Sequence, residues 1–490
     1  MKLIPEKVDI KTGNKYIAVL HEDTARMFDL HAGDRIILKN KKNVIRALLD
    51  TTPTMRKDHI KLFTEAWDLL EAKKGDKITV EMAEKPISTM YIKEKLNGIA
   101  LTKAKINEIV KDIVEDDLTD IEMTYFVSAC YIHGLNDQET ADLTRSIVAN
   151  GNKLKFKDKI IVDKHCIGGV PGNRTTMIVV PMLTAAGLKM PKTSSRSITS
   201  PAGTADTMEV LANVTNQAPK LMKIANKVGG FITWGGGVDL AAADDRLIRV
   251  RHPLSLDPEG MLLASIMAKK HSVGANHVLI DIPIGKTVKI SNMKQAQHLR
   301  QRFLKIAKLL GMKAEVIITD GKEPIGNGVG PLLEAIDVIK VLKNEKDAPQ
   351  DLKNKCIKLV AILLELTKKA HKGQGLNMAK ELLESGAAWK KMQEIIKEQG
   401  EKKIPKLSSI FIDIKAEKSG KVIEIHNKKI SRVCRVAGAP KDIQGGVYLY
   451  KKTGDKVKKG EILFRIYSSS KQLLDYASKF AKEDSAYTIK

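Results

Sequence analysis

Apolar and polar residues alternate in short runs over the first 86 positions of the chain. The runs YIAVLH, RIILKN, NVIRALLD and KITVEM have the two-residue period of half-buried strands, and turns such as AGD and KKGD separate them. The pattern therefore predicts a β-rich domain at residues 1–86.

The period changes after the polar segment AEKPIST. Five aliphatic residues then recur at helical spacing and fall on one helix face: Ile106, Ile109, Val110, Ile113 and Val114. The segments TDIE (119–122) and NDQE (136–139) have the form of capping boxes, which satisfy free backbone N–H groups at the start of a helix. We predict a helical domain at residues 87–152, joined by part of 244–275.

Residues 153–345 alternate between strand-like and helical runs. KIIVDKH, NHVLIDIPI and KAEVIIT have the character of strands, whereas TTMIVVPMLTAAG and LRQRFLKIAKLLG have that of helices. Such alternation is typical of an α/β domain, here with a mixed or parallel sheet. A helical connection follows at 346–407 and includes MAKELLESGAAWKKMQEII (378–396). At 408–490 the period of two returns, which predicts a small C-terminal α+β domain rich in strands. The predicted fold class is α/β multidomain.

The charge of the chain narrows the functional class. Lys and Arg together number 83 against 58 Asp and Glu, which gives a formal net charge of +25. The lysines are spread along the whole chain, without an arginine-rich tail or interleaved aromatic residues. We interpret the charge as a surface that steers small polyanions towards a site, with no nucleic acid as a partner. A basic nucleic-acid-binding protein remains an alternative that rests on charge alone.

The sequence predicts a cytoplasmic protein without membrane contact. No apolar run approaches the ~20 residues of a membrane span, and the start MKLIPEKVDIKTG lacks the apolar stretch of a secretory signal. The four cysteines lie far apart and form no C-x-x-C pair, a spacing that fits neither a zinc site nor a disulfide framework. We expect no bound metal, and we expect Cys130, in the run FVSACYI, to be buried.

The segment KHCIGGVPGNRTT (164–176) directly follows a predicted strand. It matches neither G-x-x-x-x-G-K-[ST] nor G-x-G-x-x-G. A strand, a glycine turn and hydroxyl residues at a helix start nevertheless form an arrangement that binds anions through backbone N–H groups. The alternative is a tight turn that merely needs glycine. Lys164 and Arg174 favour an anion site.

Two further segments carry candidate chemistry. TSSRSITSPAGT (193–204) holds seven hydroxyl residues around Arg196, so it is either a solvated loop or a second anion-binding loop. In LSLDPEGMLLASIMAKKHSVG (254–274), Asp257 and Pro258 have the form of a helix start, with the proline at the first helical position. Asp257, Ser265 and Lys269 would then present a carboxylate, a hydroxyl and an ammonium group in a row. The alternative is a capped surface helix.

Together the three segments resemble the thymidine phosphorylase family of nucleoside phosphorylases. KHCIGGV, SSRSITSPAGTAD and SIMAKK match the family patterns K-H-S-x-G-G-V, S-x-R-x-x-x-x-x-x-G-T-x-D and S-I-x-x-K-K. This resemblance runs from about residue 90 to the C-terminus. The β-rich first 85 residues and the amino-acid sequence of the second segment are similar to those of the archaeal AMP phosphorylases within that family.

The resemblance implies a reaction and its partners. A helical domain and an α/β domain would face each other across a cleft, followed by the C-terminal domain. The reaction would be phosphorolysis of AMP to adenine and ribose 1,5-bisphosphate, with CMP and UMP as further substrates. The resemblance implies no cofactor, because phosphate is a co-substrate, and it implies a homo-oligomer, at least a dimer. A nucleoside monophosphate requires two anion sites, and the sequence offers two hydroxyl- and glycine-rich loops.

The resemblance also assigns roles to residues. Asp257 would donate the proton to the leaving base, and Lys269 would lie on the base side as the next candidate for the acid. Phosphate contacts carry over to Lys164, Thr176, Ser194 and Thr204. Nucleotide contacts carry over to Gly169, Ser195, Arg196, Ser197, Ile198, Thr199, Ser200, Thr204, Ser265 and Lys289.

The chain departs from the family pattern at three places. Cys166 replaces the family serine and is a weaker hydrogen-bond donor. Arg174 is an extra cation in a loop one residue longer than that of the thymidine enzymes, and it could suit a nucleotide. The family arginine on the base side has no clean counterpart, because the alignment places Val250 there, between Arg249 and Arg251.

Two other enzymes remain as alternatives. The first is a pyrimidine nucleoside phosphorylase, which would need one phosphate site. The second, anthranilate phosphoribosyltransferase, shares the fold but requires magnesium-binding acidic motifs that the sequence does not show.

Overall fold

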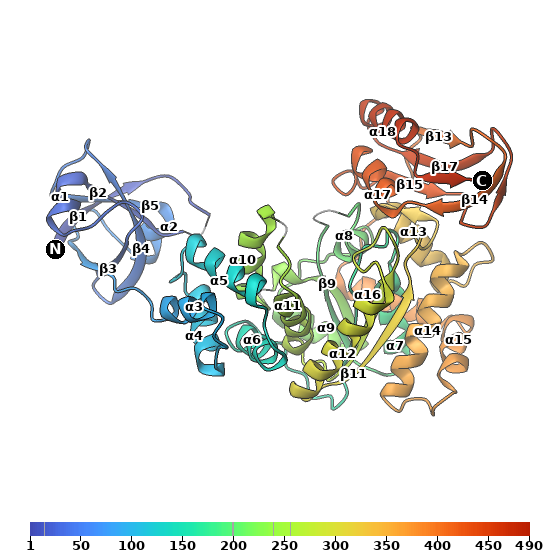
Figure 1. The fold of residues 1–490 in the computed structure, drawn as a ribbon, viewed down its shortest axis with the longest axis horizontal. Helices are drawn as coiled ribbons and strands as arrows, with labels where there is room; N and C mark the ends of the chain where they lie inside the picture. The colour runs from blue at the N-terminus through green and yellow to red at the C-terminus, as the bar shows by residue number, and fades with distance from the viewer. Residues whose placement is uncertain (14, 198–199, 239, 255) are drawn as a thin grey trace. The chain divides into compact units, whose positions relative to one another are not determined.

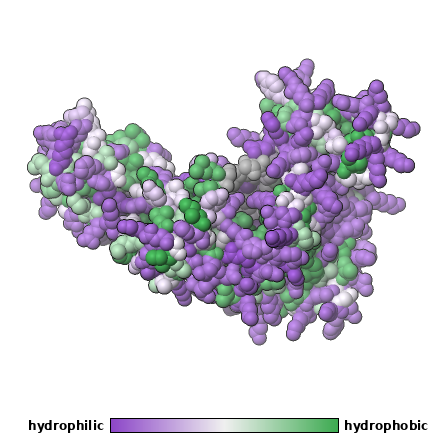
Figure 2. All heavy atoms as spheres, viewed as in Figure 1, coloured by the Kyte–Doolittle hydropathy of each residue, from purple (hydrophilic) through white to green (hydrophobic). Residues whose placement is uncertain are grey.

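The computed structural model describes residues 1–490 except 14, 198–199, 239 and 255. The chain forms two compact units (Figure 1). The first comprises Met1–Gly134 with Arg246–Pro258, and the second comprises Leu135–Asp245 with Glu259–Lys490. Hydrophilic residues cover most of the visible surface of each unit (Figure 2), as expected for a lysine-rich chain. Among the described helices, none has the length and apolar composition that crossing a membrane requires.

The first unit begins with a closed β-barrel of strand order β1-β5-β2-β4-β3-β6. Its core is aliphatic, with Leu20, Leu38 and Leu49 fully buried. Four predicted strands are confirmed, whereas β1 and β5 were not predicted because charged residues and Pro5 break their alternation. The barrel elements are β1 (Lys2–Val8), β2 (Ile17–His21), α1 (Glu22–Met27), β3 (Arg35–Asn40), β4 (Asn43–Thr52), β5 (His59–Phe63), α2 (Thr64–Leu69) and β6 (Ile78–Met82).

Helices complete the first unit: α3 (Ser88–Leu96), α4 (Lys103–Val114) and α5 (Asp120–His133). The predicted apolar face of α4 is buried at Ile106, Ile109, Val110 and Ile113. The capping box at Thr119 is present, because the N–H of Glu122 donates to Thr119 Oγ1 at 3.2 Å. The second predicted box, at Asn136, opens α6 (Asp137–Ala149), which packs on α11 and α12 within the second unit. Cys130 is buried as predicted.

The second unit is built on parallel strands. β7 (Val162–Cys166), β10 (His277–Ile284) and β11 (Lys313–Asp320) form one parallel set, and β8 (Met190–Ser194) pairs in parallel with β9 (Gly230–Trp234). A parallel bridge between Ile161 and Lys189 links the two sets. The predicted α/β alternation is therefore confirmed. The remaining elements up to residue 342 are α7 (Thr175–Ala185), α8 (Thr204–Glu209), α9 (Ala218–Val228), η1 (Gly235–Gly237), α10 (Ala242–Arg251), η2 (His252–Leu254), α11 (Glu259–Ser272), α12 (Met293–Leu309), β12 (Gly328–Val329) and α13 (Pro331–Leu342). Of these, η2 and the part of α10 from Arg246 onwards belong to the first unit.

The helical stretch predicted at 378–396 is two helices. Gly386 adopts a left-handed backbone conformation, φ 75°, and separates α15 (Gly375–Glu384) from α16 (Ala387–Gln399), after α14 (Gln350–Leu366). The C-terminal part is α+β, and its larger sheet has the order β12-β15-β17-β13. Its elements are β13 (Phe411–Lys415), β14 (Gly420–Ile425), α17 (Asn427–Val436), β15 (Gly446–Leu449), β16 (Lys456–Val457), β17 (Ile462–Tyr467), α18 (Lys471–Glu483) and β18 (Tyr487–Ile489).

Candidate active site

The glycine loop connects the end of β7 to the start of α7. Gly168, Gly169 and Gly172 all have positive φ. A Cβ atom on Gly172 would collide with the carbonyl oxygen of Ile325, so this position requires glycine. A Cβ atom on Gly169 would lie 2.9 Å from the backbone nitrogen of Lys289. The fold therefore brings these two predicted nucleotide-binding residues together.

Lys164 lies beside this loop and is almost fully buried. Its Nζ donates a hydrogen bond to Thr175 Oγ1 at the first residue of α7. Thr176, also buried, occupies the second helical position, where backbone N–H groups have no partner within the helix. Burial lowers the pKa of the Lys164 ammonium group, since it penalises the charged form. The predicted phosphate contacts Lys164 and Thr176 thus lie at one helix start.

Buried charges lie on both faces of β7, because the side chains of Asp163 and Lys164 point to opposite sides of the sheet. Asp163 forms ion pairs with Lys192, at 3.0 Å, and with Lys270, at 2.8 Å. Asp281 forms an ion pair with Lys355 at 2.8 Å. Burial alone would raise the pKa of both carboxyls, but the lysines outweigh it and lower both.

On the face of Lys164, two ammonium groups, Lys164 and Lys355, accompany one buried carboxylate, Asp281. Uncompensated buried charge is costly, so a bound anion would balance this excess. Asp281 and Lys355 come from distant parts of the sequence, and the one signal for them was Asp281, a charge inside the apolar run NHVLIDIPI.

His165 lies within this group of charges and is held neutral. Burial lowers its pKa well below the usual value, and the ammonium groups of Lys270, Lys192, Lys164 and Lys269 lower it further. Because Lys269 contributes to that shift, the base-side candidate lies within electrostatic range of the end of β7.

The second loop runs from Ser194, at the end of β8, to Thr204, at the start of α8. Asp206 organises it by accepting hydrogen bonds from the N–H groups of Ser197, at 2.7 Å, and Gly203, at 2.8 Å. Ser194 Oγ donates to the carbonyl of Thr233 at 3.4 Å.

The other predicted contacts in this loop differ in their environment. Ser195 and Ser200 are exposed. Ile198 and Thr199 lie outside the described residues. Arg196 pairs with Asp206 at 3.2 Å and with Glu209, and its guanidinium lies 5.2 Å from the ring centroid of Trp234. Its charge is therefore already neutralised by two carboxylates.

The interpretation of Arg174 as an extra cation for a nucleotide needs correction. Arg174 is buried and forms an ion pair with Glu334, which is also buried. Its Nη1 donates to Thr204 Oγ1 at 2.9 Å, and its Nη2 donates to the carbonyl of Ala202 at 2.7 Å. Arg174 therefore connects the glycine loop to the second loop.

Ser265 and Lys269 lie together on α11, as their spacing predicts. Ser265 Oγ donates to Asp244 Oδ2 at 2.7 Å, and Lys269 Nζ lies 2.8 Å from the same carboxylate oxygen. Lys269 Nζ also donates to Ser265 Oγ at 3.3 Å. The buried carboxylate that accompanies this hydroxyl and ammonium is thus Asp244, which the sequence analysis did not single out.

Asp257 belongs to the first unit. Helix α11 begins at Glu259, so Pro258 precedes the helix and the predicted proline at its first position is wrong. The Asp257 side chain is 58% exposed, and its Oδ1 lies 4.0 Å from Nη1 of the buried Arg251. Arg249, the other arginine next to Val250, pairs with Asp120 at 3.0 Å. An exposed carboxyl is free to meet a ligand.

One group of acidic side chains could hold a metal ion. The carboxylates of Asp112, Glu115 and Asp117 lie within 4.8 Å of one another. Asp117 already forms an ion pair with Arg46, so this pair accounts for its charge and we assign no metal to the group.

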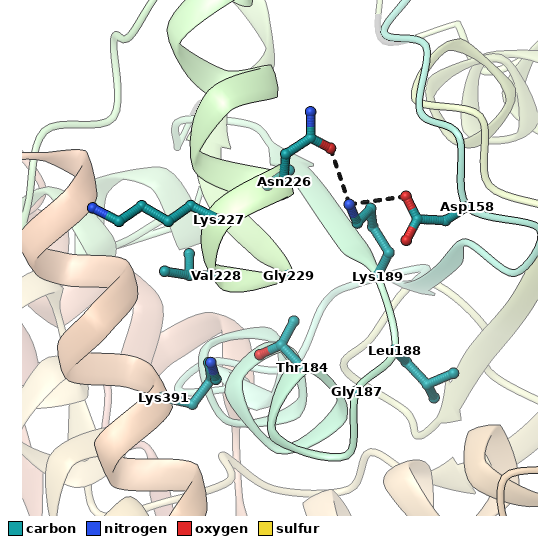
Figure 3. Close-up of a pocket in the computed structure, with 11 residues that line it drawn as sticks. Asp158, Thr184, Gly187, Leu188, Lys189, Asn226, Lys227, Val228, Gly229 and Lys391 are labelled. Carbon is teal, nitrogen blue, oxygen red and sulfur yellow. Dashed lines mark hydrogen bonds and ion pairs between the residues drawn. The ribbon is translucent and has the colours of Figure 1, made fainter.

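A hollow on the second unit lies at the opposite ends of the strands from the two loops. Figure 3 shows Lys189 between Asp158 and Asn226, with Lys227 and Lys391 nearby. Lys189 precedes β8, whereas the second loop follows that strand. The predicted site residues are not among those that line the hollow.

The thiol of Cys166 should be replaceable by a hydroxyl. Burial raises the pKa of this thiol to about 11, and Asn173 Nδ2 donates to its sulfur at 3.2 Å. A serine hydroxyl can accept the same bond and is the better donor. We therefore expect Cys166→Ser to leave kcat within about twofold and to lower the KM for phosphate slightly. Steady-state kinetics with varied phosphate test this, and a loss of activity beyond tenfold would contradict it.

Three family models and several known proteins match the chain. Residues 89–151 match the helical bundle domain of the glycosyl transferase family, and residues 158–389 match its a/b domain. Residues 421–488 match the pyrimidine nucleoside phosphorylase C-terminal domain. An AMP phosphorylase of Methanococcus aeolicus is 40% identical over 476 residues, 96% of this chain and 94% of that relative. The chain belongs to the AMP phosphorylase family.

Other relatives place the family in a wider context. A putative thymidine phosphorylase of Chelativorans sp. (strain BNC1) is 39% identical over 477 residues, 96% of this chain and 94% of that protein. The solved structure of anthranilate phosphoribosyltransferase from Thermus thermophilus superimposes with a TM-score of 0.54 at 16% identity. It covers 63% of this chain and 98% of its own length. At that identity, the likeness shows a common fold only.

Proposed function

We propose that this protein catalyses the phosphorolysis of AMP, and also of CMP and UMP. A nucleoside 5′-monophosphate and inorganic phosphate are its substrates, and a free base and ribose 1,5-bisphosphate are its products. The similarity to AMP phosphorylases over nearly the whole chain supports the reaction class. The observation that supports a nucleotide rather than a nucleoside as the substrate is the presence of two separate cationic positions, Lys164 and Lys289, at the glycine loop.

The first position suits the attacking phosphate. Lys164, Thr176 and the start of α7 supply a charge, a hydroxyl and free N–H groups. Their neighbourhood carries the excess of buried positive charge described above. The second position suits the 5′-phosphate, because Lys289 is exposed and its backbone packs against Gly169.

The reaction needs one bond made, one bond broken and one proton delivered. A phosphate oxygen attacks C1′ of the ribose while the C1′–N bond breaks and its electron pair passes to the base. The phosphate stabilises the positive charge that develops on the ribose. Asp257 donates a proton to the base as general acid. Ser265 and Lys269 orient the base, with Asp244 holding both.

The requirement for a 5′-phosphate provides the test of this function. Binding energy from the remote phosphate should appear in the rate, so kcat/KM for AMP should exceed that for adenosine at least ~100-fold. Release of adenine from AMP and from adenosine, and of thymine from thymidine, would be followed with and without phosphate. Equal efficiency on adenosine and AMP would contradict the proposal, and activity on thymidine alone would favour a pyrimidine nucleoside phosphorylase.

We also propose that the protein is a homo-oligomer. Ile121, Tyr125 and Ile132 recur at helical spacing on α5 and expose 69%, 55% and 69% of their surface. Contiguous exposed apolar residues are typical of an interface. Ile121→Lys should lower the mass measured by light scattering towards that of a single 54.1 kDa chain. An unchanged mass would place the interface elsewhere.

A further inference from the structure

Arg174 connects three parts of the second unit through separate N–H groups. Nε forms the ion pair with Glu334 near the start of α13, Nη1 reaches Thr204 and Nη2 reaches the carbonyl of Ala202. Glu334 is itself held by the N–H of Gly330 at 3.0 Å and by Thr207 Oγ1 at 3.4 Å. A planar guanidinium reaches three acceptors from three separate nitrogens held in a rigid plane, whereas the donors of a lysine all come from one nitrogen.

The contact with Thr204 determines the direction of its hydroxyl. A guanidinium is a donor only, so Thr204 Oγ1 must be the acceptor of the 2.9 Å bond. A hydroxyl has one hydrogen, and this hydrogen then points away from Arg174 and can be donated elsewhere. Thr204 is a predicted contact of both phosphate and nucleotide, and anions are acceptors.

We propose that Arg174 is a positioning residue that aims the Thr204 hydroxyl at the attacking phosphate. We assign Arg174 no contact with the phosphate itself, because Glu334 neutralises its charge and Nε, Nη1 and Nη2 already donate to Glu334, Thr204 and Ala202. The inference rests on the proposed function for the identity of the anion. The proposal gives a role to Arg174, the residue by which the glycine loop departs from the corresponding loop of the thymidine enzymes.

The test is a double-mutant cycle on the binding of inorganic phosphate, measured by calorimetry without nucleotide. Arg174→Lys keeps the charge facing Glu334 but loses the guanidinium hydrogen bonds to Thr204 and Ala202. It should raise the phosphate Kd about tenfold. Thr204→Val removes the donor and should raise Kd at least as much, whereas Thr204→Ser should restore it. If Arg174 acts through Thr204, the double variant should bind phosphate no worse than Thr204→Val alone. A purely structural role for Arg174 would instead multiply the two effects.

Two further variants complete the design. Arg465→Lys is the matched control, because Arg465 forms a two-point ion pair with Asp413 in the C-terminal sheet, and it should leave phosphate Kd unchanged. If Arg174→Lys lowers Tm steeply, Glu334→Gln replaces it, since it keeps Arg174 and removes only the charge opposite Nε. Because Glu334→Gln also leaves the charge of Arg174 uncompensated, the readout of this variant is its non-additivity with Thr204→Val rather than a loss of fixed size.

The outcomes separate this proposal from the proposed function. An unchanged phosphate Kd in Arg174→Lys, or effects that multiply, would overturn the positioning role. If the double-mutant cycle is non-additive but the protein releases no adenine from AMP, the positioning role of Arg174 is supported and only the proposed reaction is overturned. Absence of phosphate binding by the wild type would overturn both.

Discussion

Asp257→Asn should lose about 10²–10⁴-fold in kcat while still binding AMP, the range typical of a lost general acid. Asparagine has the shape of the carboxyl group but cannot deliver the proton. The side chain is more than half exposed and contacts Arg251 only at 4.0 Å. The free energy of unfolding should therefore change by no more than about 0.5 kcal/mol.

Single-turnover kinetics with AMP, together with AMP binding by calorimetry, separate proton transfer from binding. Asp475→Asn, at an exposed position on α18, is the matched control and should keep full activity. Near-normal turnover of Asp257→Asn would remove Asp257 from the chemistry. The acid would then have to be sought on the base side, with Lys269 as the first candidate.

Lys164→Met should raise the KM for phosphate about 100-fold and change the KM for AMP much less. Methionine keeps much of the volume of the lysine side chain, but the variant loses a charge-assisted hydrogen bond to an anion in a buried site. Lys189→Met is the matched control, because Lys189 is also buried and paired but lies at the opposite ends of the strands (Figure 3). A normal KM for phosphate in Lys164→Met would make the glycine loop a structural turn.

The same lysine should give phosphate binding a pH dependence. Burial lowers the pKa of Lys164 in the free protein, and only the protonated amine attracts phosphate. Phosphate affinity should therefore fall as the pH rises through that lowered pKa, and binding should be accompanied by proton uptake. The alkaline fall should be absent in Lys164→Met, and calorimetry in buffers of different ionisation enthalpy measures the proton uptake. An unchanged alkaline fall in this variant would assign the titration to another group.

Local patterns in the sequence predicted local structure well. The capping box at Thr119 involves residues three positions apart, and its geometry is determined by that spacing. The buried strand β7 and the glycine loop are contiguous, so a strand–turn–helix arrangement could be predicted from a single stretch. Strand β1 was missed because Pro5 and its charged neighbours conceal the alternation, although Pro5 takes its place in a parallel pairing with Ile60.

Contacts between distant residues could not be predicted. Lys164 lies near Asp281 and Lys355, and no periodicity relates these positions. Arg174 was interpreted as an extra cation for a nucleotide because its partner, Glu334, lies 160 residues away. Asp244 was missed for the same reason. Its helix precedes α11 in the chain, and the side chains of Ser265 and Lys269 reach it only in the folded unit.

The central claim is that inorganic phosphate becomes bonded to C1 of the ribose as the base leaves. Phosphorus NMR of the protein with AMP and phosphate would measure this directly, with adenine quantified in the same samples. We expect one ribose 1,5-bisphosphate for each adenine released and for each inorganic phosphate consumed. Adenine release that proceeds without phosphate, or that yields ribose 5-phosphate, would contradict phosphorolysis and indicate hydrolysis instead.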